Sequence, residues 1–92
     1  MIESPRSKSL RDLFAKGTSS KIDQRLHKRV LMRLDRLDAA VAPEDMDLPG
    51  FGFHELKGKR KGIYSVHVNG PWCATFMWGQ DGPYEVDYEQ YH

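Results

Sequence analysis

The first hydrophobic positions of the chain repeat with the spacing of an α-helix. Three apolar residues share one helical face: Leu10, Leu13 and Phe14. Ser7 or Ser9 can cap the start of this helix, and Gly17 can end it. The pattern therefore predicts a short helix over residues 7–16.

A longer apolar stripe follows after a polar connector. Its members lie three or four positions apart: Ile22, Leu26, Val30, Leu34, Leu37 and Val41. The stripe predicts a second helix that Ser20 or Asp23 caps and that ends before Pro43. Five cations lie mostly outside the stripe: Arg25, Lys28, Arg29, Arg33 and Arg36.

Beyond a loop over residues 42–52, the hydrophobic period changes to two, which is typical of β-strands. Three strands are expected: residues 63–68, 72–78 and 84–91. Alternation places one set of side chains on one sheet face: Tyr64, Val66, Val68, Trp72, Ala74, Phe76, Trp78, Tyr84, Val86 and Tyr88. A more polar set lies on the other face: Ser65, His67, Cys73, Thr75, Met77, Glu85, Asp87, Glu89 and Tyr91.

Two helices followed by an antiparallel meander predict an α+β fold in which the helices cover one face of the sheet. The 92 residues suffice for one small domain over residues 1–92. No apolar run approaches the ~20 residues that cross a membrane, and the N-terminus lacks the pattern of a secretory signal. The single cysteine, Cys73, cannot form an internal disulfide, so we expect a cytoplasmic protein.

The net charge of +1 hides a strong asymmetry. Residues 1–62 contain all 14 Lys and Arg and nine of the 13 acids, which gives a net charge of +5. Residues 63–92 contain four acids and no Lys or Arg. This asymmetry favours a basic surface that meets a polyanion such as nucleic acid. The alternative is two mixed, solvated faces that meet in the fold.

The densest charged segment is residues 54–62, His-Glu-Leu-Lys-Gly-Lys-Arg-Lys-Gly. Four of its five central residues are cationic, and glycines relax the backbone around them: Lys57, Lys59, Arg60 and Lys61. Several cationic donors beside a titratable group are what a phosphate site needs. The alternative is a solvated hairpin loop whose lysines only aid solubility.

The carboxy-terminus carries a second candidate group, Tyr91 and His92. Both side chains can carry protons, although a terminal His is also typical of a frayed end. His67 lies on the same predicted sheet face, either as part of a site or as an exposed strand residue. The His and acidic residues show no metal-ligand spacing, and no nucleotide-binding glycine loop occurs, so we expect neither a metal nor another cofactor.

Five short motifs occur in order along the chain: Ser-x-x-Leu-x-x-Leu-Phe-x-x-Gly near the start, His54-Glu55-Leu56-Lys57-Gly58, Gly62-x-Tyr64-Ser65-Val66-x-Val68-Asn69, Trp72-x-x-Thr75-Phe76, and the final Tyr91-His92. Together they resemble the HigB toxins, plasmid-maintenance proteins of the RelE/ParE superfamily. The resemblance covers essentially the whole chain. It implies a RelE-like fold, two N-terminal helices packed on a curved antiparallel sheet.

The resemblance also implies metal-free cleavage of messenger RNA in the ribosomal A site. His54 matches the active-site histidine of the family, Lys57 is placed to stabilise phosphate charge, and Tyr91 and His92 match the terminal pair. Lys59, Arg60 and Lys61 are better candidates for attachment to RNA or the ribosome. The implied partner is a HigA-like helix-turn-helix antitoxin, through which alone the toxin meets operator DNA.

Two positions depart from the family pattern. Cys73 stands where an arginine commonly follows the strand tryptophan, and a thiol supplies neither its fixed charge nor its fork of donors. Gln90 stands where an acid can precede the terminal pair. The chain is therefore a slow nuclease, a nuclease that uses Arg60 or Lys59 instead, or a weakened or inactive member that binds its antitoxin and acts in operon control. A third alternative is a ParE-like inhibitor of DNA gyrase.

Overall fold

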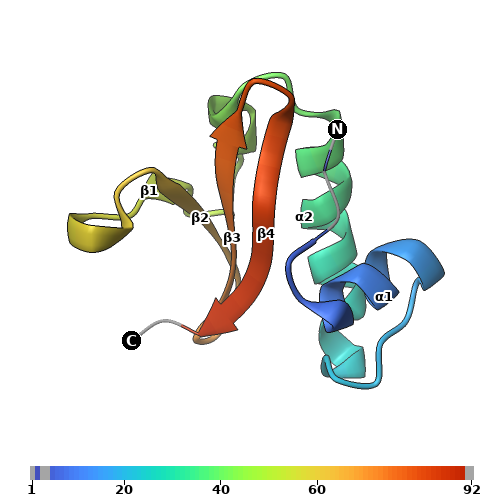
Figure 1. Cartoon of the computed structure of the whole chain (residues 1–92). Coiled ribbons are helices and arrows are strands. Elements are labelled where there is room, and N and C mark those ends of the chain that lie inside the picture. Colours follow the sequence, from blue (N-terminus) through green and yellow to red (C-terminus); the bar gives the residue numbers. More distant parts are fainter. Residues whose placement is uncertain (1, 3–4, 91–92) are drawn as a thin grey trace.

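The computed structural model describes residue 2 and residues 5–90, and it contains two α-helices that pack on one face of a twisted, curved sheet (Figure 1). The helices are α1 (Lys8–Lys16) and α2 (His27–Ala39), with 3₁₀ turns η1 (Gln24–Leu26), η2 (Pro43–Met46) and η3 (Gly58–Arg60). The strands are β1 (His54–Glu55), β2 (Ile63–Asn69), β3 (Trp72–Gly79) and β4 (Gly82–Gln90). They pair antiparallel in the order β1-β2-β3-β4, which confirms the predicted α+β fold.

The first helix has the predicted caps. The Ser7 hydroxyl accepts a hydrogen bond from the amide of Leu10, so it satisfies one of the donors that a helix start leaves unpaired. Gly17 adopts a left-handed conformation and donates its amide to the carbonyl of Leu13. This geometry ends the helix, because residues with a side chain rarely adopt it.

The second helix is shorter than the sequence pattern predicts. Asp23 caps the 3₁₀ turn η1, and α2 itself begins only at His27. The backbone is extended at Ala40, so Val41 lies beyond the helix and is 87% exposed. The placement of Val41 on the apolar stripe was therefore wrong, since the helical period stops before it. No helix within the described residues is long and apolar enough to cross a membrane.

Arg33 also departs from the pattern, because this cation of α2 is buried. Its Nε donates to the carbonyl of His67 at 2.7 Å, and its guanidinium lies 4.5 Å from the centre of the Phe51 ring. Burial lowers the pKa of Arg33, and the neighbouring charge of Arg29 lowers it further. Arg33 thus ties α2 to β2 and to the segment that leads into β1.

The core lies between the helices and the inner face of the sheet. Strand alternation places the aromatic and branched residues there as predicted, and the most buried of them are Val66, Phe76 and Val86. Trp72 and Tyr88 stack at the edge of this core with ring centroids 4.6 Å apart. Burial of these side chains is the main source of stability in such a small domain.

Tyr84 does not share the inner face, because β4 contains a bulge. Glu85 has a φ of 51°, and the register of β3 and β4 shifts between Thr75 and Met77. The extra residue pairs Tyr84 with Met77, which alternation places on the outer face. The predicted position of Tyr84 was therefore wrong, because strict alternation does not survive a bulge.

Candidate functional site

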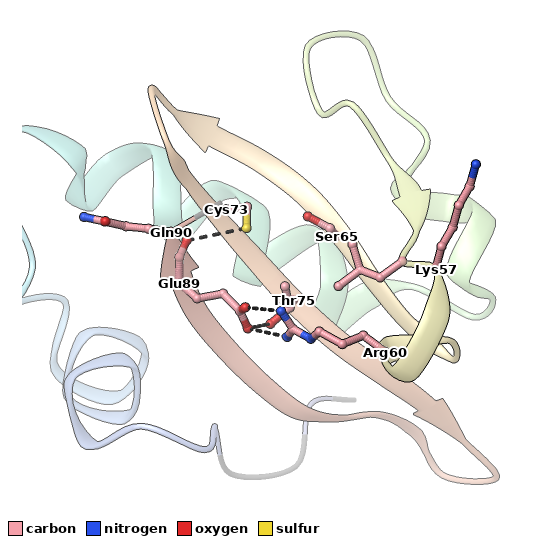
Figure 2. A pocket seen from close by; sticks show the side chains of 8 residues that line it. Lys57, Arg60, Ser65, Cys73, Thr75, Glu89 and Gln90 are labelled. Carbon is pink, nitrogen blue, oxygen red and sulfur yellow. Dashed lines mark hydrogen bonds and ion pairs between the residues drawn. The ribbon is translucent and has the colours of Figure 1, made fainter. Parts of the chain in front are cut away.

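The outer face of the sheet, which the helices leave uncovered, contains a pocket of about 270 Å³ (Figure 2). Short side chains of β2 and β3 form its floor, and the segment from β1 to β2 and the end of β4 form its walls. The lining residues are Leu56, Lys57, Arg60, Ser65, Cys73, Thr75, Glu89 and Gln90. Ser65, Cys73 and Thr75 are as buried as the core, so the floor of the pocket is well covered.

Arg60 reaches across the pocket to Glu89. Its Nη1 and Nη2 donate to the two carboxylate oxygens of Glu89 at 2.6 and 2.9 Å, in a parallel, two-bond geometry. The hydroxyl of Thr75 donates to the same carboxylate at 2.7 Å, and the thiol of Cys73 lies 3.5 Å from the carbonyl oxygen of Glu89. Hydrogen bonding to Glu89 raises the pKa of Arg60, so its guanidinium stays charged at every working pH.

The loop between β1 and β2 positions Arg60. It projects from the sheet on the side away from the helices (Figure 1). Gly58 and Gly62 have φ angles of +69° and +94°, which side-chain-bearing residues rarely adopt. The amide of Gly62 donates to a carboxylate oxygen of Glu55 at 3.1 Å, which holds the loop closed at its base. The η3 turn, which begins at Gly58, directs Arg60 back over the sheet.

His54 lies on the same outer face, since β1 pairs it with Ser65 of the pocket floor. The His54 side chain is exposed, and its Nδ1 lies 2.9 Å from the carbonyl oxygen of Gly52. Because a carbonyl only accepts, Nδ1 carries the hydrogen in this bond. This bond fixes the orientation of the imidazole ring on the outer face.

Comparison with known proteins assigns the chain to a family. The family model described as "RelE-like toxin of type II toxin-antitoxin system HigB" matches residues 3–92. The curated protein "Endoribonuclease HigB" of Proteus vulgaris is 34% identical over 92 residues, which covers 100% of both chains. The chain belongs to the family of HigB-like toxins. A cognate antitoxin is therefore its partner.

The structure brings some of the predicted site residues of this toxin together. Lys57 and Cys73 line the pocket, although the ammonium of Lys57 points away from the Arg60–Glu89 pair (Figure 2). His54 shares the face of the pocket. Tyr91 and His92 lie outside the described residues, so their place in the site stays a prediction. Among residue 2 and residues 5–90, no group of His, Cys, Asp and Glu has the geometry to hold a metal ion.

The cationic side chains of the basic loop, residues 57–61 between β1 and β2, do not all point the same way. Lys59 and Lys61 are exposed on it, whereas Arg60 turns into the pocket, although the sequence grouped all three as attachment residues. Glu89 and Thr75 were not among the predicted site residues. Their alternation already placed both on the outer face, but only the pairing of β3 with β4 shows that they meet.

Proposed function

We propose that this toxin cleaves messenger RNA in the ribosomal A site without a metal and thereby inhibits translation. The family match and the full-length relative named Endoribonuclease HigB support its action as an endoribonuclease toxin. The observation that carries the proposal further is the outer pocket, which combines a charged guanidinium with the sheet face that presents His54. Guanidinium and imidazole are the groups that metal-free phosphodiester cleavage needs.

The proposed reaction starts from the ribose 2′-hydroxyl beside the scissile phosphate. The 2′-oxygen forms a bond to phosphorus and gives its proton to Nε2 of His54, while the bond from phosphorus to the 5′-oxygen breaks. The leaving oxygen takes a proton, for which Tyr91 and His92 are the proposed donors. The products are a 2′,3′-cyclic phosphate and a 5′-hydroxyl end. Lys57 supplies positive charge near the phosphate, and Lys59 and Lys61 attach the toxin to RNA or ribosome.

The proposed partner is a HigA-like helix-turn-helix antitoxin, and the toxin meets operator DNA only through it. The proposed place of action is the bacterial cytoplasm, where ribosomes and messenger RNA occur. The finer identity of the antitoxin rests on the resemblance of the sequence motifs to the HigB toxins. A small helix-turn-helix protein that copurifies with the tagged toxin would support it.

The test uses purified toxin, ribosomes stalled on a defined messenger RNA, and mapping of the RNA ends. Wild type is expected to cut within the A-site codon, and His54→Ala is expected to lower the rate by roughly 10²–10⁴, as loss of a general base does. His67→Gln is the matched control, a histidine of β2 outside the pocket, and it should keep the wild-type rate. Intact RNA with the wild-type toxin, or equal rates for wild type and His54→Ala, would contradict the proposal.

Cys73 supports a second candidate, a toxin that binds its antitoxin and cuts RNA weakly. Its thiol is buried in the pocket floor and does not supply the fixed positive charge that an arginine would bring to a phosphate. Cys73→Arg is expected to raise the cleavage rate if this second candidate holds, and Cys73→Ser, which adds no charge, is the control. DNA damage responses without RNA cleavage would instead favour gyrase inhibition.

A further inference from the structure

We infer that Arg60 is the phosphate-binding guanidinium of the pocket, and that Glu89 is a built-in competitor whose carboxylate occupies Arg60 until an RNA phosphate displaces it. This inference rests on the proposed function, since it names the residue of the outer pocket that receives the scissile or a neighbouring phosphate. It also assigns to Glu89 a role that depends on being replaced by substrate.

The geometry of the ion pair is the first argument. Both terminal nitrogens of Arg60 engage both oxygens of Glu89, at 2.6 and 2.9 Å. A phosphate presents two oxygens to a guanidinium in the same parallel arrangement, so a phosphate can take the place of this carboxylate. Among the described residues that line the pocket, Arg60 is the one arginine, and the ammonium of Lys57 points away from it (Figure 2).

The position of the pair is the second argument. Both residues line the pocket, and the side chain of Arg60 is 45% exposed and that of Glu89 is 25% exposed. A partly exposed ion pair contributes little to stability, because water screens its charges. An incoming anion can therefore reach Arg60 without unfolding any element of the sheet.

The support beneath the pair is the third argument. The Thr75 hydroxyl donates to the Glu89 carboxylate at 2.7 Å, so Glu89 keeps one hydrogen-bond donor when Arg60 leaves it. Arg60 stands on a loop whose two flanking glycines have positive φ, and it reaches over the strand that carries Cys73. Arg60 can thus deliver from the loop the charge that Cys73 does not supply.

The experiment titrates inorganic phosphate into the full-length toxin and follows the backbone amides of the pocket by NMR. Glu89→Gln removes the competing charge and is expected to tighten phosphate binding roughly tenfold, the size of one charge-assisted contact. Arg60→Gln is expected to abolish the pocket shifts, and Arg60→Lys to retain part of them. The double variant Arg60→Gln/Glu89→Gln should show no gain over Arg60→Gln alone.

The matched control is the Asp23–Arg25 pair, which has a similar two-bond geometry at 2.8 and 3.2 Å but lies at η1, away from the pocket. Asp23→Asn releases an arginine on the surface and should leave the pocket shifts unchanged. An equal effect of Asp23→Asn and Glu89→Gln on pocket binding would overturn the inference, since any freed arginine would then suffice. Unchanged phosphate binding in Glu89→Gln, with a lowered urea midpoint, would overturn it in favour of a structural ion pair.

RNA cleavage by the same variants separates the two proposals. Cleavage of RNA by Arg60→Gln with the same kcat and KM as wild type would overturn the role of Arg60. The endoribonuclease proposal would stay intact. Tight phosphate binding by Glu89→Gln without any RNA cleavage by wild type would leave the anion site standing and overturn the proposed function.

Discussion

The two faces of the sheet are equally well covered at their centres but are built from different chemistry. Phe76 on the inner face is 0% exposed, and its neighbour Thr75 on the outer face is 2% exposed. The inner face is covered by helices and filled with aromatic and aliphatic side chains. The outer face contains the pocket, whose floor consists of Ser65, Cys73 and Thr75 and which Arg60 enters from the glycine-flanked loop. Similar burial therefore serves stability on one face and a polar site on the other.

The difference predicts that adjacent residues of β3 have separable effects, and the largest effect belongs to Phe76. Phe76→Ala removes a fully buried ring and is expected to lower the free energy of unfolding by about 3–5 kcal/mol. Thr75→Val removes one hydrogen bond to Glu89 and is expected to cost only about 1 kcal/mol while it alters phosphate binding. Urea unfolding and phosphate titration of both variants measure the two effects.

A milder substitution at Phe76 keeps the comparison testable if Phe76→Ala does not fold. Phe76→Leu retains most of the apolar volume and should lower stability less than Phe76→Ala while it leaves phosphate binding as in wild type. A Thr75 variant that costs as much stability as Phe76→Ala would contradict the division between the two faces.

Substitution of Arg33 is expected to cause the next largest loss of stability, and it tests the buried contacts that tie α2 to the sheet. Arg33→Ala leaves the carbonyl of His67 without its donor and is expected to cost about 2–3 kcal/mol. Arg36→Ala, at an exposed position of the same helix, should change stability by less than about 0.5 kcal/mol. Equal urea midpoints for the two variants would show that the buried contacts of Arg33 add nothing.

The smallest expected effect on stability is that of Tyr88, and it occurs only at high pH. Its hydroxyl has no hydrogen-bond partner among the described residues, and burial raises the pKa of Tyr88 from 10.0 to about 12. Between these values the unfolded chain loses the proton while the folded chain retains it, so stability should fall as the pH rises from 10 to 12. Tyr88→Phe should remove this part of the fall, as urea midpoints at pH 9 and pH 11 would show. An unchanged fall in Tyr88→Phe would assign it to other groups.

Hydrophobic periodicity predicted the fold because most inner-face residues obey it. It failed at Val41, where an extended Ala40 ends the helix, and at Tyr84, where a bulge shifts the alternation. Neither the end of the helix at Ala40 nor the bulge in β4 can be predicted from the spacing of the apolar residues. Hydrophobic periodicity also did not predict the burial of Arg33, since the carbonyl that this cation binds lies 34 residues away in the chain.

The candidate site was predictable in its location but not in its pairing. The basic run and the alternation of polar residues indicated the outer face, and His54 indeed lies there. The contact of Arg60 with Glu89 spans 29 residues and depends on the path of the loop over the sheet, which composition does not determine. The resemblance supplied the family, which the full-length match confirms.

The most direct measurement asks which face of the toxin touches messenger RNA in the proposed complex with the ribosome. A photo-crosslinking residue is placed either at Lys61 in the basic loop or at Met32, which is 47% exposed on α2. The messenger RNA carries 2′-O-methyl groups in the A-site codon, so it cannot be cut. Crosslinks to this codon are expected from position 61 and not from position 32. Crosslinks from position 32 alone would contradict a site on the outer face.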